Sequence, residues 1–122
     1  MTNNYKKLLL SSLLSSLLLA NANASNLEIK NDTSSEVNIV IEGEGGTIGT
    51  NKEAIKSSLK SGGTETVQVD RTTFGVETFS ITGKVTMPST NNKCELLLID
   101  KDYKILFIEG KAGMIICKAI EK

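Results

Sequence analysis

Apolar residues recur at every second position over most of the chain beyond residue 25, and this period of two constrains the fold more than any other feature. On a pleated strand, such alternation places one set of side chains in the core and the other in water. Shorter runs of the same kind cover residues 27–30, 37–42 and 66–70. The longest run is expected to end at Pro88, which has no N–H to donate to a sheet, and its inward positions are Phe79, Ile81, Gly83, Val85 and Met87.

The last third of the chain is apolar on both faces of its expected strands, 94–100, 103–109 and 114–120. In the middle one, Ile105 and Phe107 point to one side while Leu106 and Ile108 point to the other. Strands of this kind are typical of the middle of a structure. We therefore expect a short helix or another subunit to cover the second side.

The fold class predicted from these runs is all-β, with or without one short helix: a β-sandwich or small barrel of about seven antiparallel strands. Residues 25–122 are expected to form a single β-sandwich domain. The pattern resembles immunoglobulin-like sandwiches in architecture only, because those carry a tryptophan packed on their disulfide and this chain has no tryptophan. Architecture of this kind carries no function.

One segment departs from the alternation and predicts a short helix over residues 51–60. Thr50 stands three residues before Glu53, which is the spacing of a capping box. Ile55 and Leu59 are four apart, and Gly62 is placed for a C-terminal cap. An irregular connection between sheets is the alternative, since two apolar anchors make a marginal helix.

The first 24 residues have the pattern of a cleaved secretory signal peptide. Lys6 and Lys7 precede an apolar stretch over 8–19, and small residues two apart end the segment, which places cleavage between Ala24 and Ser25. A membrane anchor or a first helix is the alternative, but about twelve apolar-biased residues are too few to cross roughly 30 Å of hydrocarbon.

Two of the 14 basic residues lie in this leader and none of the 14 acidic ones do, so the remaining domain has a net charge of −2. The net charge of a slightly acidic domain gives no electrostatic footprint for nucleic acid or for an anionic membrane. We therefore expect no nucleic-acid partner and, after cleavage, no membrane span.

The two cysteines, Cys94 and Cys117, are expected to form a disulfide, as an even count does in exported domains. A catalytic or zinc-binding thiol is less favoured, because the chain has no histidine to act as base or co-ligand. In a flat three-stranded meander, these cysteines would lie on strands roughly 9–10 Å apart. A disulfide needs Cα atoms within about 7 Å. The pair therefore predicts that one cysteine strand crosses to the facing sheet or curls at its end, so that the bridge links the two layers.

A glycine-rich segment over 43–50 lacks the lysine of a phosphate-binding loop and the glycine spacing of a dinucleotide loop. We interpret it as a turn and as a possible binding loop, since loops on a rigid sandwich commonly carry recognition. No cofactor and no metal are predicted. The residues of the possible binding loop are Gly43, Glu44, Gly45, Gly46 and Thr47.

Three further groups have a plain structural interpretation beside a chemical one. Asp100 and Asp102 are spaced like calcium ligands but lack the rest of a calcium loop, and a hairpin turn explains them. Glu42 and Glu44 are spaced like an acid–base pair but lack the aromatic platforms of a sugar-binding cleft. Asn31 begins a glycosylation acceptor sequence, and an Asx turn is the alternative.

The function expected from these features is that of an exported, non-enzymatic protein that acts by binding: an envelope or secreted interaction module, an inhibitor or an adhesin-like domain. Its partner would be a protein or surface ligand outside the cytoplasm. One alternative is a structural subunit that self-associates through residues 94–120. The other is a small secreted hydrolase that uses serine with lysine or carboxylates.

Overall fold

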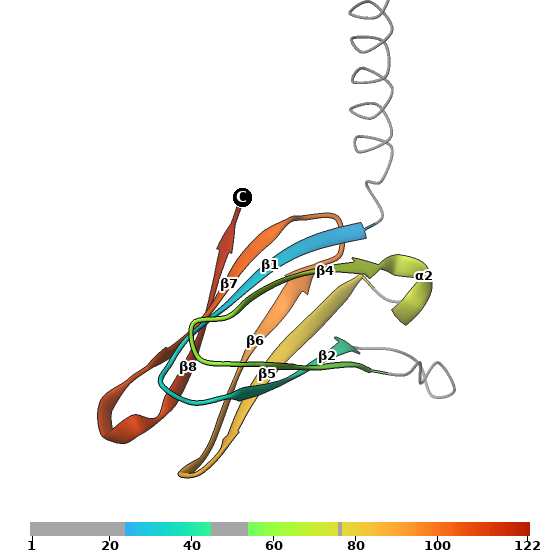
Figure 1. Cartoon of the computed structure of the whole chain (residues 1–122). Coiled ribbons are helices and arrows are strands. Elements are labelled where there is room, and N and C mark those ends of the chain that lie inside the picture. The colour runs from blue at the N-terminus through green and yellow to red at the C-terminus, as the bar shows by residue number, and fades with distance from the viewer. Residues whose placement is uncertain (1–23, 45–53, 76) are drawn as a thin grey trace, which may run out of the picture.

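A computed structural model describes residues 24–44, 54–75 and 77–122 of the chain and shows a small β-sandwich (Figure 1). Within these ranges no helix is long and apolar enough to cross a membrane. A single helical turn, α2, spans Arg71–Phe74, and a 3₁₀ turn spans Lys111–Gly113. The strands are β1 (Ala24–Asp32), β2 (Val37–Glu44), β3 (Ile55–Leu59), β4 (Thr64–Asp70), β5 (Thr78–Thr86), β6 (Ser89–Leu98), β7 (Tyr103–Glu109) and β8 (Ile115–Glu121).

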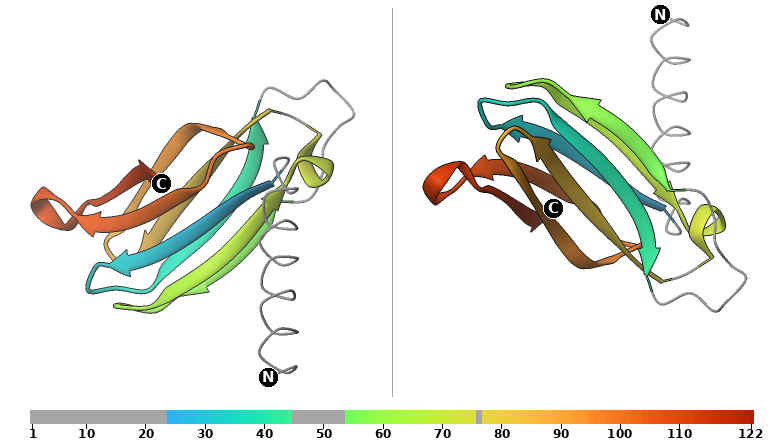
Figure 2. Two further views of the ribbon diagram at one scale, coloured as in Figure 1. Left: turned by 90° about the horizontal axis from the view of Figure 1, so that it is seen from above. Right: turned by 90° about the horizontal axis from the view of Figure 1, so that it is seen from below.

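Two four-stranded sheets make the two layers. Sheet A has the order β4-β1-β7-β8, and sheet B has the order β3-β2-β5-β6. In the view from below, β2, β5 and β6 cross in front of β1 (Figure 2). The predicted fold class is confirmed, with eight strands in the described part of the chain where about seven were expected. The pairing of β1 with β7 is parallel, and all other pairings are antiparallel.

The alternating residues fill the space between the sheets as predicted. Leu27, Ile29, Ile81 and Ile105 are fully buried. β5 ends at Thr86, before the proline. The expected inward position of Met87 is wrong: this residue lies in the β5–β6 turn and is 83% exposed. The strand had already ended one residue earlier, so the alternation no longer decides which way its side chain points.

The predicted helix over 51–60 is wrong where the structure describes it, because Ile55–Leu59 is strand β3. Residues 51–53 lie outside the described part of the chain. A spacing of four puts Ile55 and Leu59 on one side of a helix and equally on one side of a strand. Pairing with β2 selects the strand, with Leu59 opposite Val37. Gly62 has the positive φ expected of a cap, +76°, but uses it in the turn between β3 and β4.

The predicted disulfide between Cys94 and Cys117 is present, with Cα atoms 5.6 Å apart. Cys94 lies in β6 of sheet B and Cys117 in β8 of sheet A, so the bridge links the two layers. The prediction that one cysteine strand crosses to the facing sheet is confirmed.

Two hydrogen bonds continue the same link along β6. Asn92 Oδ1 accepts from the Cys117 N–H at 2.8 Å, and Thr90 Oγ1 accepts from the Ile115 N–H at 3.2 Å. Every second residue of β6 from Thr90 to Cys94 therefore holds β8. We call this set of three contacts the inter-sheet clasp.

Asn31 closes the opposite side of the sandwich. Its fully buried side-chain amide donates to the carbonyl oxygens of Ser35 at 2.7 Å and Leu59 at 2.8 Å. Its Oδ1 accepts from the backbone N–H of Thr33 at 3.0 Å and from the Thr33 hydroxyl at 2.6 Å. The Asx turn is therefore present, and the amide nitrogen that a glycan would need is buried and fully used.

The side-chain amide of Asn31 yields a stability prediction. Asn31→Asp replaces two N–H donors by an acceptor that faces two carbonyl oxygens. Each buried polar group left unpaired costs about 1–3 kcal/mol. We expect a loss of roughly 3 kcal/mol or more, and each kcal/mol lowers Tm by about 4–8 °C in a domain of this size. Thermal unfolding followed by circular dichroism measures it. The matched control is Asn91→Asp, at an exposed asparagine, and equal melting of the two variants would contradict the role of Asn31.

The disulfide yields a second stability prediction. Replacing both cysteines by serine releases a loop with a sequence separation of 23 residues. In the chain-entropy model this costs roughly 3–4 kcal/mol. Denaturant unfolding of the double variant, compared with the oxidised parent, measures the difference. A midpoint unchanged from that of the parent would show that the bridge does not stabilise the sandwich.

Candidate functional site

Three loops meet at one end of the sandwich and enclose a small cavity of about 90 Å³. They are the β1–β2 loop at 33–36, the β5–β6 turn at 87–88 and the β7–β8 hairpin at 110–114. In Figure 1 this end includes the hairpin at the lower left. We call it the loop end. The cavity is lined by Thr33, Ser34, Ser35, Val85, Pro88, Glu109, Gly113 and Ile115.

A wider hollow of about 410 Å³ adjoins the cavity and shares Pro88 and Gly113 with it. Met114, which lines this hollow, is 59% exposed, and Met87, which precedes the lining residue Pro88 in the chain, is 83% exposed. Methionine is flexible and polarisable, and it is common on binding surfaces. The hollow is lined by apolar and by hydrogen-bonding residues: Pro88, Ser89, Thr90, Asn91, Ala112, Gly113 and Met114.

The β7–β8 hairpin has a defined shape. Gly110 N–H donates to Met114 O at 2.7 Å, and Met114 N–H donates to Lys111 O at 3.2 Å. Ala112 and Gly113 both have positive φ, +59° and +72°. For alanine this conformation costs roughly 1–2 kcal/mol, and non-glycine residues held in it cluster at binding sites. The hairpin therefore presents Met114 on a fixed support.

Glu109 joins the hairpin to the β1–β2 loop. Its Oε1 accepts from the Ser34 backbone N–H at 2.6 Å and from the Ser34 hydroxyl. The hydroxyl contact, followed by the backbone contact, lowers the pKa of Glu109 below its ordinary value of 4.5. The carboxylate form therefore stabilises this corner of the loop end.

The possible binding loop predicted from sequence begins at the other end of the sandwich. Gly43 and Glu44 are the last residues of β2, and Glu44 Oε1 accepts from the Leu96 N–H of β6 at 2.8 Å. Gly45, Gly46 and Thr47 lie outside the described residues. The structure therefore gives Glu44 a role in holding β6.

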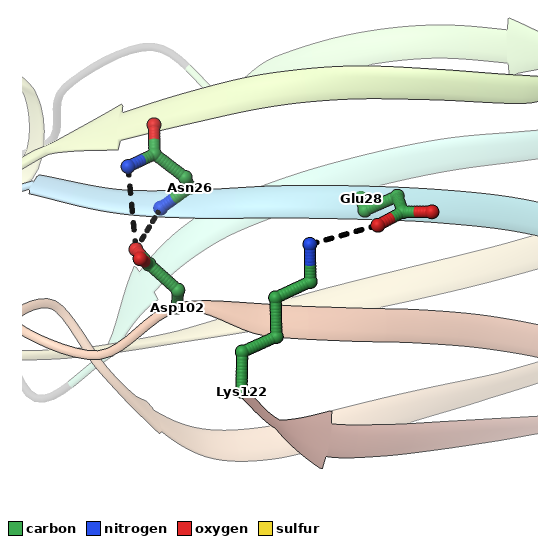
Figure 3. A network of polar contacts seen from close by, with 4 residues as sticks. All are labelled: Asn26, Glu28, Asp102 and Lys122. Carbon is green, nitrogen blue, oxygen red and sulfur yellow. Dashed lines mark hydrogen bonds and ion pairs between the residues drawn. The ribbon is translucent and has the colours of Figure 1, made fainter.

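The hairpin turn predicted at Asp100 and Asp102 is wrong, because β6 and β7 belong to different sheets and the connection between them crosses from one layer to the other. Asp102 Oδ1 accepts from the Asn26 backbone N–H at 2.9 Å and from its side-chain amide at 3.3 Å (Figure 3). Ser25, the residue after the predicted cleavage point, is fully buried and donates its hydroxyl hydrogen to Lys101 O. Across the described ranges, no three histidine, cysteine, aspartate or glutamate residues gather as metal ligands would.

Sequence reasoning missed the loop end. Met87 was assigned to the core, and nothing in the spacing of Ser34 and Glu109, 75 residues apart, signals their contact. A usable signal was present in β6, where Thr90, Asn92 and Cys94 occupy every second position before an exposed glutamate. Polar residues at these inward positions indicate an edge of the sandwich, where side chains reach the backbone of the facing sheet.

Comparison with known proteins supports the fold alone. No family model matches the chain, and no curated protein is similar to it in sequence. Among solved structures, an NMR structure of a protein from Eubacterium rectale is similar, with a TM-score of 0.56 and 15% identity. The match covers 82% of this chain and 91% of that one.

The contact between Glu109 and Ser34 predicts a pH-dependent loop end. The pKa of Glu109 is lowered in the folded state, so the contact contributes stability above the ordinary value of 4.5 and loses it as the pH falls through the lowered pKa. NMR titration should therefore show the Ser34 amide shifting together with the Glu109 carboxyl, with a midpoint below 4.5.

Ser34→Ala should raise the Glu109 midpoint part of the way to the ordinary value, because the backbone N–H still donates. Ser35→Ala, in the same loop, serves as the matched control and should leave it unchanged. A Ser34 amide that does not follow the carboxyl would show that the contact is absent in solution.

Proposed function

We propose that this protein is an exported binding module that contacts a protein or surface ligand through its loop end. The observation that carries the proposal is the exposure of two methionines at turns of the loop end, where Met114 lines the hollow together with Ser89, Thr90 and Asn91. Exposed apolar side chains rimmed by polar ones are typical of interaction sites.

Export is supported by two features of the chain. The first 24 residues have the pattern of a secretory signal, and the sandwich is held by a disulfide, a bond that persists in oxidising compartments. A binding role rather than catalysis is favoured by the missing histidine and by the engagement of Glu109, Glu44 and Asp102 with backbone N–H groups.

A binding mode follows from the shape of the loop end. Met87 and Met114 project from different hairpins, so a partner that seats an apolar side chain between them can also reach the polar groups of Ser89 and Asn91 in the hollow. Two exposed apolar side chains surrounded by polar groups can be buried at the centre of an interface, where a few contacts contribute most of the binding energy.

A photo-crosslinking amino acid placed at Met114 in the producing organism tests the proposal. We expect one discrete crosslinked product, which disappears when Met87→Asp is added, because a charge at the apolar rim must be desolvated on binding. The matched control places the crosslinker at Lys56, an exposed residue of β3.

The protein recovered from the same cells should have a mass that begins at Ser25, and it should carry no label after alkylation without reduction. A labelled full-length product would contradict export. An identical crosslinked product from Lys56 would contradict the loop end as the binding surface.

A further inference from the structure

Two apolar patches of opposite charge lie on opposite outer faces of the sandwich. The first covers the β7–β8 half of sheet A, where Ile108 stands opposite Ile116, Leu106 opposite Lys118 and Lys104 opposite Ile120. Lys30 of β1 stands opposite Leu106. We call this the basic patch: Lys30, Lys104, Leu106, Ile108, Ile116, Lys118 and Ile120.

The acids next to the basic patch do not cancel its charge. Glu28 is bound by the Lys122 side chain at 2.7 Å (Figure 3). That hydrogen bond, together with the charges of Lys122 and Lys104, lowers the pKa of Glu28. The other acids on this face are Asp32, beside Ile108, and Asp102, which accepts hydrogen bonds from Asn26. Lysines therefore outnumber acids around the exposed isoleucines.

The second patch lies on sheet B, where β6 bulges opposite β5 between Phe79 and Ile81. Leu96 in the bulge has a φ of +57° and is 72% exposed, and Leu98 is also exposed. A leucine held in this conformation is unusual, and a bulge re-aims the side chain it carries. We call this the acidic patch: Glu42, Glu44, Lys93, Glu95, Leu96 and Leu98.

Negative charge dominates the acidic patch. Glu95 is 3.1 Å from the ammonium group of Lys93 and, by hydrogen bonding to it, is the main cause of its raised pKa, with smaller contributions from Glu44 and Glu42. Next to the two leucines, three glutamates therefore stand against Lys93, while Lys56 and Lys84 lie farther along the same face.

We propose that the acidic patch of one copy binds the basic patch of a second copy. Each patch has aliphatic side chains at its centre. The charged rim of one patch is opposite in sign to the rim of the other, and this arrangement favours specific docking. The patches lie on different faces, so the contact is head-to-tail and leaves one free patch at each end. Copies joined in this way extend into a chain unless the rotation closes a ring.

Self-association by strand pairing at the edge of β8 is less favourable. The outward N–H groups of Ile115 and Cys117 already donate to β6 side chains. Extension of sheet A by another strand would have to displace the inter-sheet clasp, which includes the disulfide. Self-association through residues 94–120 therefore uses faces rather than the edge, and it leaves the loop end free for a different partner.

Analytical ultracentrifugation of the protein produced from the full sequence and isolated in its processed form tests this. The average mass should rise with concentration and fall with added salt, because salt screens the charged rims. Lys118→Glu with Ile120→Glu disrupts the basic patch. Glu42→Lys with Leu96→Lys disrupts the acidic patch and spares Glu44, which holds the bulge. Each double variant should weaken association by about tenfold or more.

Mixing the two double variants distinguishes head-to-tail binding from other arrangements. Each retains the patch that the other has lost, so the mixture should form dimers with one intact contact and nothing larger. The matched control is Lys60→Glu, which reverses an exposed lysine of the β3–β4 turn outside both patches and should associate like the parent.

Three results would overturn the proposal. The parent could remain a monomer at every concentration, the control could lose association to the same extent, or the mixed variants could stay monomeric. Loss of the loop-end crosslink in a protein that still self-associates would count against the proposed function alone.

Discussion

The inter-sheet clasp is the contact on which the rest of the structure depends. Sheets A and B are joined along one side by the short turn between β3 and β4, where Asn31 ties the neighbouring segments together. On the other side no turn links β6 directly to β8, and without the clasp these two edge strands would be free to separate. A small domain buries a limited share of its surface, so a covalent link at this side has a large effect on its stability.

The clasp also decides which surfaces can bind. An edge strand ordinarily presents free N–H groups to any passing strand. Here Thr90 and Asn92 accept from two of the outward N–H groups of β8. The apolar residues that remain exposed are therefore on faces and turns: Met87, Leu96, Leu98, Met114, Ile116 and Ile120. Among the described residues, all these large exposed apolar side chains come from the stretch between β5 and the end of β8.

Period-two alternation was enough to predict the fold class and most of the core, because inward side chains such as Ile39 and Ile105 obey it in every layer. The alternation failed at Ile55 and Leu59, because a spacing of four residues fits one side of a helix and one side of a strand equally well. Only pairing with β2 decides between the two. The bridge between layers could be predicted from distance alone, because two strands of one flat sheet cannot bring Cys94 and Cys117 close enough. The loop end could not, because its contacts join residues far apart in sequence, and single residues such as Ser34 carry no periodic signal.

The sheet order shows which apolar residues of the last three strands are covered and which are not. β7 lies between β1 and β8, so its inner side chains are buried, and its outer ones, Leu106 and Ile108, are only partly covered. The predicted helix that was to cover them is a strand of the other sheet. Burial of the exposed part of these aliphatic side chains against a docking partner would contribute roughly 25 cal/mol of binding free energy for each Å² removed from water. Because the acidic patch is on the opposite sheet, a second copy can supply that cover without closing off the loop end, and each added copy would bring another loop end to the same array. Linked binding surfaces hold a multivalent ligand more tightly than one surface does, so self-association and loop-end binding would reinforce each other.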